Sequence, residues 1–310
     1  MGGYDRPKSS SVKHLNHLNH CVNSKTLNIA TLNVCGLRKR SQYPDFVEYF
    51  DRFDLICFVE TKLEDIDVIS IPGFQCFSQP RKQKYIRKSG GIALFAKDKF
   101  FEHCKYLVTD SDYIMWVSVD RSIASTEEDL IIGITYVPPS QSRFFNDDEL
   151  QTLENEITSM CSSHKYVFIT GDLNARTARL SDYVQLDEFL AETFELDDET
   201  INFFNKTTIL EQLKIPLNRT SNDTKTNNAG YWLMNVCKNN NLFIVNGRVG
   251  KDKNIGNKTF RDQSVIDYTL CTADCFYLLQ QFEIIELDEF FSDGHSLLSW
   301  SLNMNSKHTT

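Results

Sequence analysis

Polar side chains that could bind a metal ion or move a proton follow several short apolar runs of this sequence. Asp172 and Asn174 come directly after the run Tyr166–Thr170. Four further groups of this kind occur at Leu27–Asn33, Leu55–Glu60, Ile131–Tyr136 and Val265–Asp267, and a fifth at Ser292–His295. Short β-rich runs that end in polar residues are typical of buried strands. Carboxylate, amide, phenol and imidazole groups at strand ends are what a metal-assisted phosphodiesterase needs, and they predict an active site.

Three of these residues favour metal binding and activation of water. Glu60 ends an apolar run, and Mg²⁺ typically takes one or two carboxylates while keeping waters for a substrate phosphate. Asp172 and Asn174 are two residues apart, so both would project to one face if the extended conformation continues. An Asp beside an amide can orient a water and hold a phosphate oxygen. Taken alone, each residue is better explained as a strand end that happens to face water, and only the whole set favours an active site.

The remaining candidates are hydrogen-bond donors and an acid–base pair. Asn33 and Tyr136 could donate to an oxyanion that gains charge in a transition state. Asp267 and His295 form a candidate pair, because a carboxylate at one imidazole nitrogen favours the imidazolium form. The other imidazole nitrogen could then act on the scissile phosphate.

The elements that must position these residues are mostly short strands. We expect strands at 27–33, 55–60, 91–96, 115–119, 130–137, 166–170, 242–245, 265–271, 282–287 and 297–302, and helices at 44–52, 148–161 and 230–239. Asn146 or Asp147 is the expected N-cap of the second helix. So many strands with few helices predict two packed sheets flanked by helices.

The 310 residues carry a net charge of −9, which argues against binding nucleic acid through bulk charge. A basic strip at Arg81–Lys88 could still contact phosphates. Nine cysteines without a C-x-x-C pair do not suggest a disulfide framework. Without a visible signal peptide or membrane-spanning run, we expect an intracellular protein. Because the candidate residues span most of the chain, we expect a disordered lead-in at 1–26, one domain at 27–303 and a polar tail at 304–310.

The order of the motifs resembles the endonuclease/exonuclease/phosphatase superfamily. Within it, the chain is most similar to the apurinic-type endonuclease domain of non-LTR (LINE-type) retrotransposons. The resemblance covers roughly residues 27 to 302. The motifs that carry it are Thr31-Leu32-Asn33-Val34-Cys35-Gly36-Leu37-Arg38, Val59-Glu60-Thr61-Lys62-Leu63, Thr135-Tyr136-Val137-Pro138-Pro139, Gly171-Asp172-Leu173-Asn174-Ala175-Arg176, Ser264-Val265-Ile266-Asp267-Tyr268 and Ser292-Asp293-Gly294-His295.

This resemblance implies a four-layer αββα sandwich, like that of deoxyribonuclease I, with the site at one end of the paired sheets. It implies Mg²⁺-dependent, in-line hydrolysis of a DNA phosphodiester, with Mn²⁺ as a substitute, leaving a 3′-hydroxyl and a 5′-phosphate. It also implies a nuclear site of action and, in the parent element, a reverse transcriptase domain as partner. The resemblance places Glu60, Asn33 and Asp293 at the metal and Asp172 at the attacking water. It implies that Asn174 and Tyr136 hold the phosphate and that Asp267 and His295 form the carboxylate–imidazole pair. Arg176 and Ser264 would contact the substrate.

Two positions depart from the family pattern. Cys35 stands where many relatives have Asp, so a possible carboxylate near the metal is absent. Gly294 separates Asp293 from His295, which are adjacent in the usual motif; a glycine bulge could restore both positions. Two other hypotheses therefore stay open. One is a phosphoesterase of the same fold acting on inositol phosphates, lipids or RNA, and the other is an inactive relic that keeps the fold.

Overall fold

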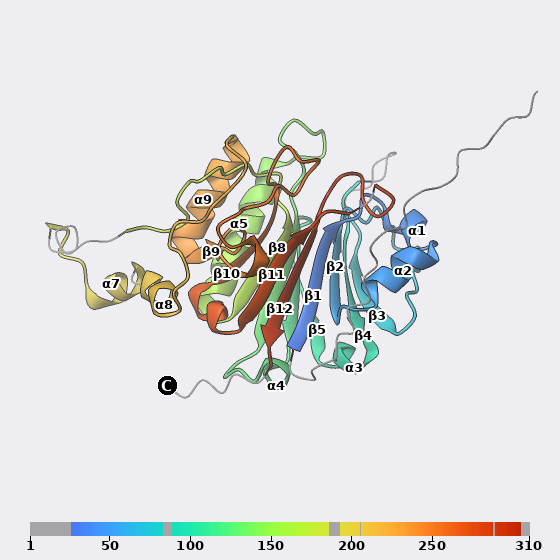
Figure 1. The fold of residues 1–310 in the computed structure, drawn as a ribbon, viewed down its shortest axis with the longest axis horizontal. Helices are drawn as coiled ribbons and strands as arrows, with labels where there is room; N and C mark the ends of the chain where they lie inside the picture. Colours follow the sequence, from blue (N-terminus) through green and yellow to red (C-terminus); the bar gives the residue numbers. More distant parts are fainter. Residues whose placement is uncertain (1–25, 83–88, 186–192, 205, 288, 305–310) are drawn as a thin grey trace, which may run out of the picture.

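Two six-stranded β-sheets pack face to face, with helices on their outer faces (Figure 1). The computed structural model describes residues 26–82, 89–185, 193–204, 206–287 and 289–304. Nearly all of the expected lead-in, residues 305–310 of the expected tail, and 83–88 of the basic strip lie outside these ranges. The αββα sandwich expected from the sequence is confirmed.

The first sheet has the strand order β11-β12-β1-β2-β4-β3. Its strands are β1 (Thr26–Asn33), β2 (Leu55–Val59), β3 (Phe74–Gln79), β4 (Ile92–Lys97), β11 (Leu279–Ile285) and β12 (Leu297–Asn303). The second sheet has the order β5-β6-β7-β8-β10-β9. Its strands are β5 (Cys104–Leu107), β6 (Ile114–Val119), β7 (Leu130–Tyr136), β8 (Val167–Asp172), β9 (Leu242–Ile244) and β10 (Asp267–Thr272).

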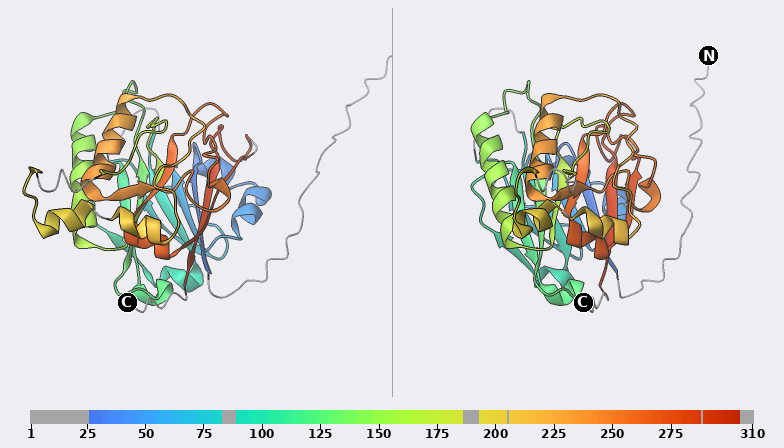
Figure 2. Two further views of the ribbon diagram at one scale, coloured as in Figure 1. Left: turned by 60° about the vertical axis from the view of Figure 1, so that its left-hand side comes forward. Right: turned by 90° about the vertical axis from the view of Figure 1, so that its left-hand side faces the viewer.

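Helices cover the two outer faces, as the rotated views in Figure 2 also show. The helices α1 (Leu37–Arg40) and α2 (Pro44–Phe50) lie on the first sheet, and α5 (Asp147–Ser163) and α9 (Asn228–Asn240) lie on the second. Shorter helices are α3 (Asp98–Phe101), α4 (Arg121–Ala124), α7 (Asp198–Phe204), α8 (Thr207–Gln212), η1 (Gly250–Asp252) and η2 (Ala273–Tyr277). None of the helices in the described ranges is both long and apolar enough to cross a lipid bilayer.

Three apolar layers hold the sandwich together. Side chains of both sheets meet in the central layer, where the rings of Phe168 and Trp300 lie 4.8 Å apart. A second layer joins β6 and β8 to α5 and α9, and a third joins β2 and β4 to α2 through a cluster of phenylalanines. Because both faces of each sheet are covered, the central strands β2 and β7 are buried along their whole length.

The sequence patterns found the central elements better than the edges. All ten expected strands are present with small shifts at their ends, and Asn146 caps α5 by accepting a hydrogen bond from the Asp148 N–H. Two strands were missed, β3 and β5. Both lie at a sheet edge, and most of their positions are exposed or half-buried, so neither gives a continuous apolar run.

Candidate active site

The strand pairing brings the ends of four strands to one end of the sandwich. In the first sheet, β1 and β2 are parallel with Asn33 beside Val59, so Glu60 follows directly at the same edge. In the second sheet, β7 and β8 are parallel with Tyr136 beside Asp172. Because parallel strands end at the same edge of a sheet, these polar side chains gather there.

A hydrogen bond joins the two sheets at this end. The Asn33 Nδ2 donates to Asp172 Oδ2 over 2.8 Å, and both side chains are buried. The antiparallel strand β10 begins at Asp267, directly opposite Asp172. Thr259 holds that start in place, because its hydroxyl oxygen accepts hydrogen bonds from the backbone N–H groups of Ile266 and Asp267, each at 3.0 Å.

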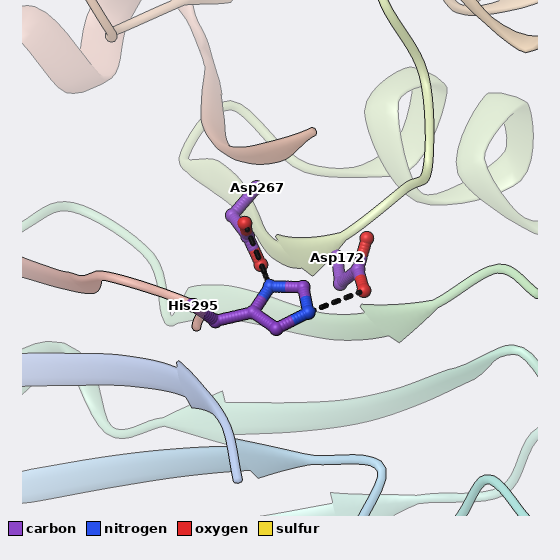
Figure 3. A group of neighbouring side chains, drawn as sticks. All are labelled: Asp172, Asp267 and His295. Carbon is purple, nitrogen blue, oxygen red and sulfur yellow. Dashed lines mark hydrogen bonds and ion pairs between the residues drawn. The ribbon is translucent and has the colours of Figure 1, made fainter. Parts of the chain in front are cut away.

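His295 lies between the two carboxylates (Figure 3). Its Nδ1 is 3.0 Å from both oxygens of Asp267, and its Nε2 is 3.9 Å from Asp172 Oδ2. All three side chains are buried. The expected carboxylate–imidazole contact is therefore present, with a second carboxylate on the far side of the ring.

Burial and mutual charge shift the proton affinities of this group. Burial raises the pKa of Asp172 to about 7, and the negative charge of Asp267 adds to the rise against the opposing effect of His295. Burial alone would lower the pKa of His295. The charge and hydrogen bond of Asp267, with further help from Asp172 and Glu60, outweigh burial and raise the pKa to about 9. Between these two values, the imidazolium of His295 and the ionised carboxylate of Asp172 coexist.

The inserted glycine is accommodated in the loop before β12. Gly294 has a φ of 108°, and a Cβ there would lie 2.5 Å from Arg261 Cγ. The Ser292 hydroxyl donates to the Asn33 carbonyl over 2.9 Å and accepts from the His295 N–H over 3.1 Å. This turn positions the imidazole against Asp267.

The turn does not bring Asp293 into the same group. Its carboxylate accepts a hydrogen bond from Arg40 over 2.5 Å, and the side chain is 56% exposed. Burial raises the pKa of the Cys35 thiol, and a hydrogen bond with the Asp293 carboxylate adds to the rise. Asp293 therefore faces Cys35 rather than His295.

Glu60 lies in a segment with unusual backbone angles. Glu60 and Lys62 have φ values of 53° and 56°, a region that non-glycine residues rarely adopt. Lys62 Nζ is 3.1 Å from Glu60 Oε1 and 3.0 Å from Cys35 Sγ. Lys62 and Cys35 also line an open cavity of about 640 Å³. The Glu60 carboxylate is thus partly exposed and already paired with a cation.

Asn174 lies just after β8, and Tyr136 is the last residue of β7. The extended conformation does not continue past Asp172, because Asn174 has a φ of 47°. The Asn174 Nδ2 donates to the Val137 carbonyl over 2.9 Å, and the condition on which the same-face prediction rested is not met. Tyr136 is buried at the end of β7. Burial, and then the charges of Glu60 and Asp172, raise the pKa of Tyr136 well above its ordinary value, which keeps its hydroxyl a donor.

The two residues expected at the substrate have partners within the protein. Arg176 Nη2 and Nε bond the two oxygens of Asp223 at 2.5 and 2.8 Å, and the Asp223 side chain is buried. Ser264 is buried, and its carbonyl accepts a hydrogen bond from the Thr259 N–H over 2.9 Å. Lys62, Thr259 and Ser292 were given no role from the sequence. Thr259 and Ser292 act through backbone atoms, whereas Lys62 contacts the side chains of Glu60 and Cys35.

The donor set suits a hard divalent cation. In the described ranges, Asp172, Asp267 and His295 are the one group of three or more acidic, His or Cys residues whose ligand atoms all lie within 4.8 Å of one another. Glu60 is outside that group but adds a carboxylate at the same end of the sandwich. One or two carboxylates beside a phosphate site are what Mg²⁺ typically uses.

Comparisons with known proteins agree with this architecture. A sequence model of the Endonuclease/Exonuclease/phosphatase family matches residues 30–293. No curated protein sequence matches the chain. Among solved structures, the chain is similar to the endonuclease domain of TRAS1, a telomere-specific non-LTR retrotransposon, with a TM-score of 0.54 and 13% identity over 91% of this chain and 100% of that one.

Two further solved structures share the fold. The AP endonuclease LMAP from Leishmania major has a TM-score of 0.60 and 11% identity, over 90% of this chain and 88% of that one. The 3′ phosphatase NExo from Neisseria, bound to a product DNA hairpin, has a TM-score of 0.56 and 11% identity, over 89% of this chain and 99% of that one.

Proposed function

The chain belongs to the Endonuclease/Exonuclease/phosphatase family, and on this premise we propose that it is a divalent-metal-dependent endonuclease that nicks DNA. The observation that carries the proposal is the buried group in which His295 lies between Asp267 and Asp172. A hydrogen bond from Asn33 to Asp172 joins this group to the sheet that carries Glu60. The fold shared with the TRAS1 endonuclease domain supports a retrotransposon origin and, with it, a nuclear site of action.

In this proposal Asp172 orients and deprotonates the attacking water. A pKa raised to about 7 suits that role, because a general base works best when its pKa is near the working pH. The water oxygen bonds to phosphorus as the bond to the 3′ oxygen breaks, which leaves a 3′-hydroxyl and a 5′-phosphate.

His295 and Tyr136 stabilise the charge that builds on the phosphate. Asp267 occupies Nδ1 of His295, so only Nε2 can donate to a phosphate oxygen, and the raised pKa keeps the ring charged at neutral pH. Tyr136 stays protonated and donates through its hydroxyl. Asn174 acts from the neighbouring turn, where its amide is fixed on the Val137 carbonyl.

Glu60 and Asn33 would hold the metal, which we propose is Mg²⁺. Bound there, the ion would supply positive charge to a phosphate oxygen. Lys62 places an ammonium group 3.1 Å from Glu60 Oε1, so the carboxylate already contacts one cation. Cys35 contributes a thiol with a raised pKa instead of a further carboxylate, so this chain offers fewer hard ligands than relatives with Asp at that position.

The test is nicking of supercoiled plasmid with Mg²⁺ or Mn²⁺ and with EDTA, run beside release of phosphate from inositol phosphates. Metal-dependent conversion of supercoiled to open-circular DNA is the expected result. Hydrolysis of inositol phosphates without nicking would replace the proposal with the phosphoesterase hypothesis. A folded protein inactive on both substrates would support the relic hypothesis.

A further inference from the structure

Arg81 follows β3 and has a buried guanidinium group without a counter-charge. Arg81 is 9% exposed, and within the described ranges its terminal nitrogens Nη1 and Nη2 have no hydrogen-bond partner. Within the described ranges no carboxylate pairs with it. The adjoining residues 83–88 have the sequence Gln-Lys-Tyr-Ile-Arg-Lys, which contains no acidic residue.

Two aromatic rings lie near the guanidinium group of Arg81. Its Cζ lies 5.9 Å from the ring centre of Tyr113 and 5.5 Å from that of Phe144. Both distances are near the outer limit of about 6 Å for a cation–π contact. Such contacts offset little of the cost of removing a full charge from water, and buried charges in proteins are normally paired.

The position of Arg81 relates it to the candidate active site. A Cβ on Gly90 would lie 3.0 Å from Arg81 Nε, and the Gly90 carbonyl accepts a hydrogen bond from the Lys62 N–H over 2.8 Å, two residues after Glu60. On the other side, the Tyr113 carbonyl accepts from the Tyr136 N–H over 2.9 Å. Arg81 therefore lies between the segment that carries Glu60 and the strand end that carries Tyr136.

We propose that Arg81 binds a phosphate group of the nucleic-acid strand. This inference rests on the proposed function, since the strand supplies the missing counter-charge. A planar guanidinium can bond two phosphate oxygens at once, which would satisfy both free terminal nitrogens. Because those nitrogens are covered, the phosphate reaches them only when the covering side chains shift.

The proposal predicts opposite effects on stability and on binding. Arg81→Met removes an uncompensated buried charge, so the melting temperature of the free protein should rise, whereas an aromatic-stacked structural arginine would give a fall. Affinity for DNA, measured in EDTA to prevent turnover, should weaken about ten- to a hundredfold. The slope of log affinity against log salt should fall by about one.

A matched control is available in Arg52. Its guanidinium lies over two rings, 4.1 Å from Tyr49 and 4.9 Å from Phe53, on an exposed part of the molecule at the end of α2. Arg52→Met should leave DNA affinity and its salt slope unchanged. Arg81→Lys keeps the charge but loses the fork, so it should retain the salt slope with weaker binding.

The deciding measurement uses inorganic phosphate, compared with chloride at equal ionic strength. Phosphate should raise the melting temperature of wild type more than that of Arg81→Met, and this readout needs no nuclease activity. In nicking kinetics, a higher KM for Arg81→Met would show that Arg81 binds a phosphate that flanks the cleaved bond. A lower kcat would show that it binds the scissile phosphate. Equal phosphate effects in both proteins, with unchanged salt slopes, would overturn the assignment even if the wild type nicks DNA.

Discussion

Replacing Asp267 with Asn removes the negative charge 3.0 Å from His295 Nδ1 and keeps a side chain of the same size. In wild type that carboxylate outweighs burial and raises the pKa of His295 from its ordinary value of 6.5 to about 9. The difference corresponds to about 3 kcal/mol in favour of the imidazolium. Because the ring stays buried in Asp267→Asn, its pKa should fall to about 6.5 or below.

The raised pKa of His295 also determines how the stability of the protein depends on pH. His295 has a higher pKa folded than unfolded, so its contribution is fully present below pH 6.5 and is lost as pH rises through about 9. Asp172, with its own pKa raised to about 7, makes the folded state less stable as pH rises from 3.8 toward 7. The window from pH 7 to 9 lies above the Asp172 transition. The buried cysteine thiols, whose pKa values are raised, also lower stability toward pH 9, but they do so equally in wild type and in Asp267→Asn. Wild type should lose about 2 kcal/mol more unfolding free energy there than Asp267→Asn does.

Two measurements test this prediction. Titration of the histidine side chains by NMR, with His295→Gln used to assign the signal, gives the pKa directly. Urea unfolding at pH 7 and pH 9 gives the stability difference. A His295 signal that titrates near 6.5 in wild type, or near 9 in Asp267→Asn, would refute the reasoning.

Three other substitutions test separate parts of the site. Glu60→Gln should lower metal-dependent nicking about a hundredfold or more with an unchanged melting temperature, and full activity would remove Glu60 from the metal site. Arg176→Met should cost about 3 kcal/mol in urea unfolding, because Asp223 stays buried without its cation; unchanged stability with weaker DNA binding would instead restore the substrate role expected from the sequence. Gly294→Ala should cost about 1–3 kcal/mol of stability and lower nicking further by displacing His295, and a variant with normal stability and activity would contradict the strained turn.

The strand ends were predictable because local sequence determines them. Apolar runs that stop at Glu60, Tyr136 and Asp172 mark buried strands, and the sheets then bring their ends together. The contact of Asp267 with His295 was expected from the pair of residue types, and the structure places it as expected.

Other features depend on contacts that no local pattern encodes. Arg176 was expected at the substrate, but it pairs with Asp223, which lies 47 residues further along the chain. Asn174 leaves the extended conformation, and its amide bonds the carbonyl of Val137, which follows β7. Arg81 belonged to a basic strip that could contact phosphates, yet it is buried, beside the rings of Tyr113 and Phe144 far along the chain.

The most direct test of the proposed site compares two buried aspartates in the plasmid nicking assay with Mg²⁺. Asp172→Asn should abolish nicking, because it removes the group that orients the water beside His295. Asp54→Asn is the control: Asp54 is equally polar and also buried, but it lies at the opposite end of β2 from Glu60 and accepts from the Asn28 N–H. Loss of nicking in Asp172→Asn alone, with both variants folded, is the predicted result. Nicking by Asp172→Asn at the wild-type rate would contradict the account.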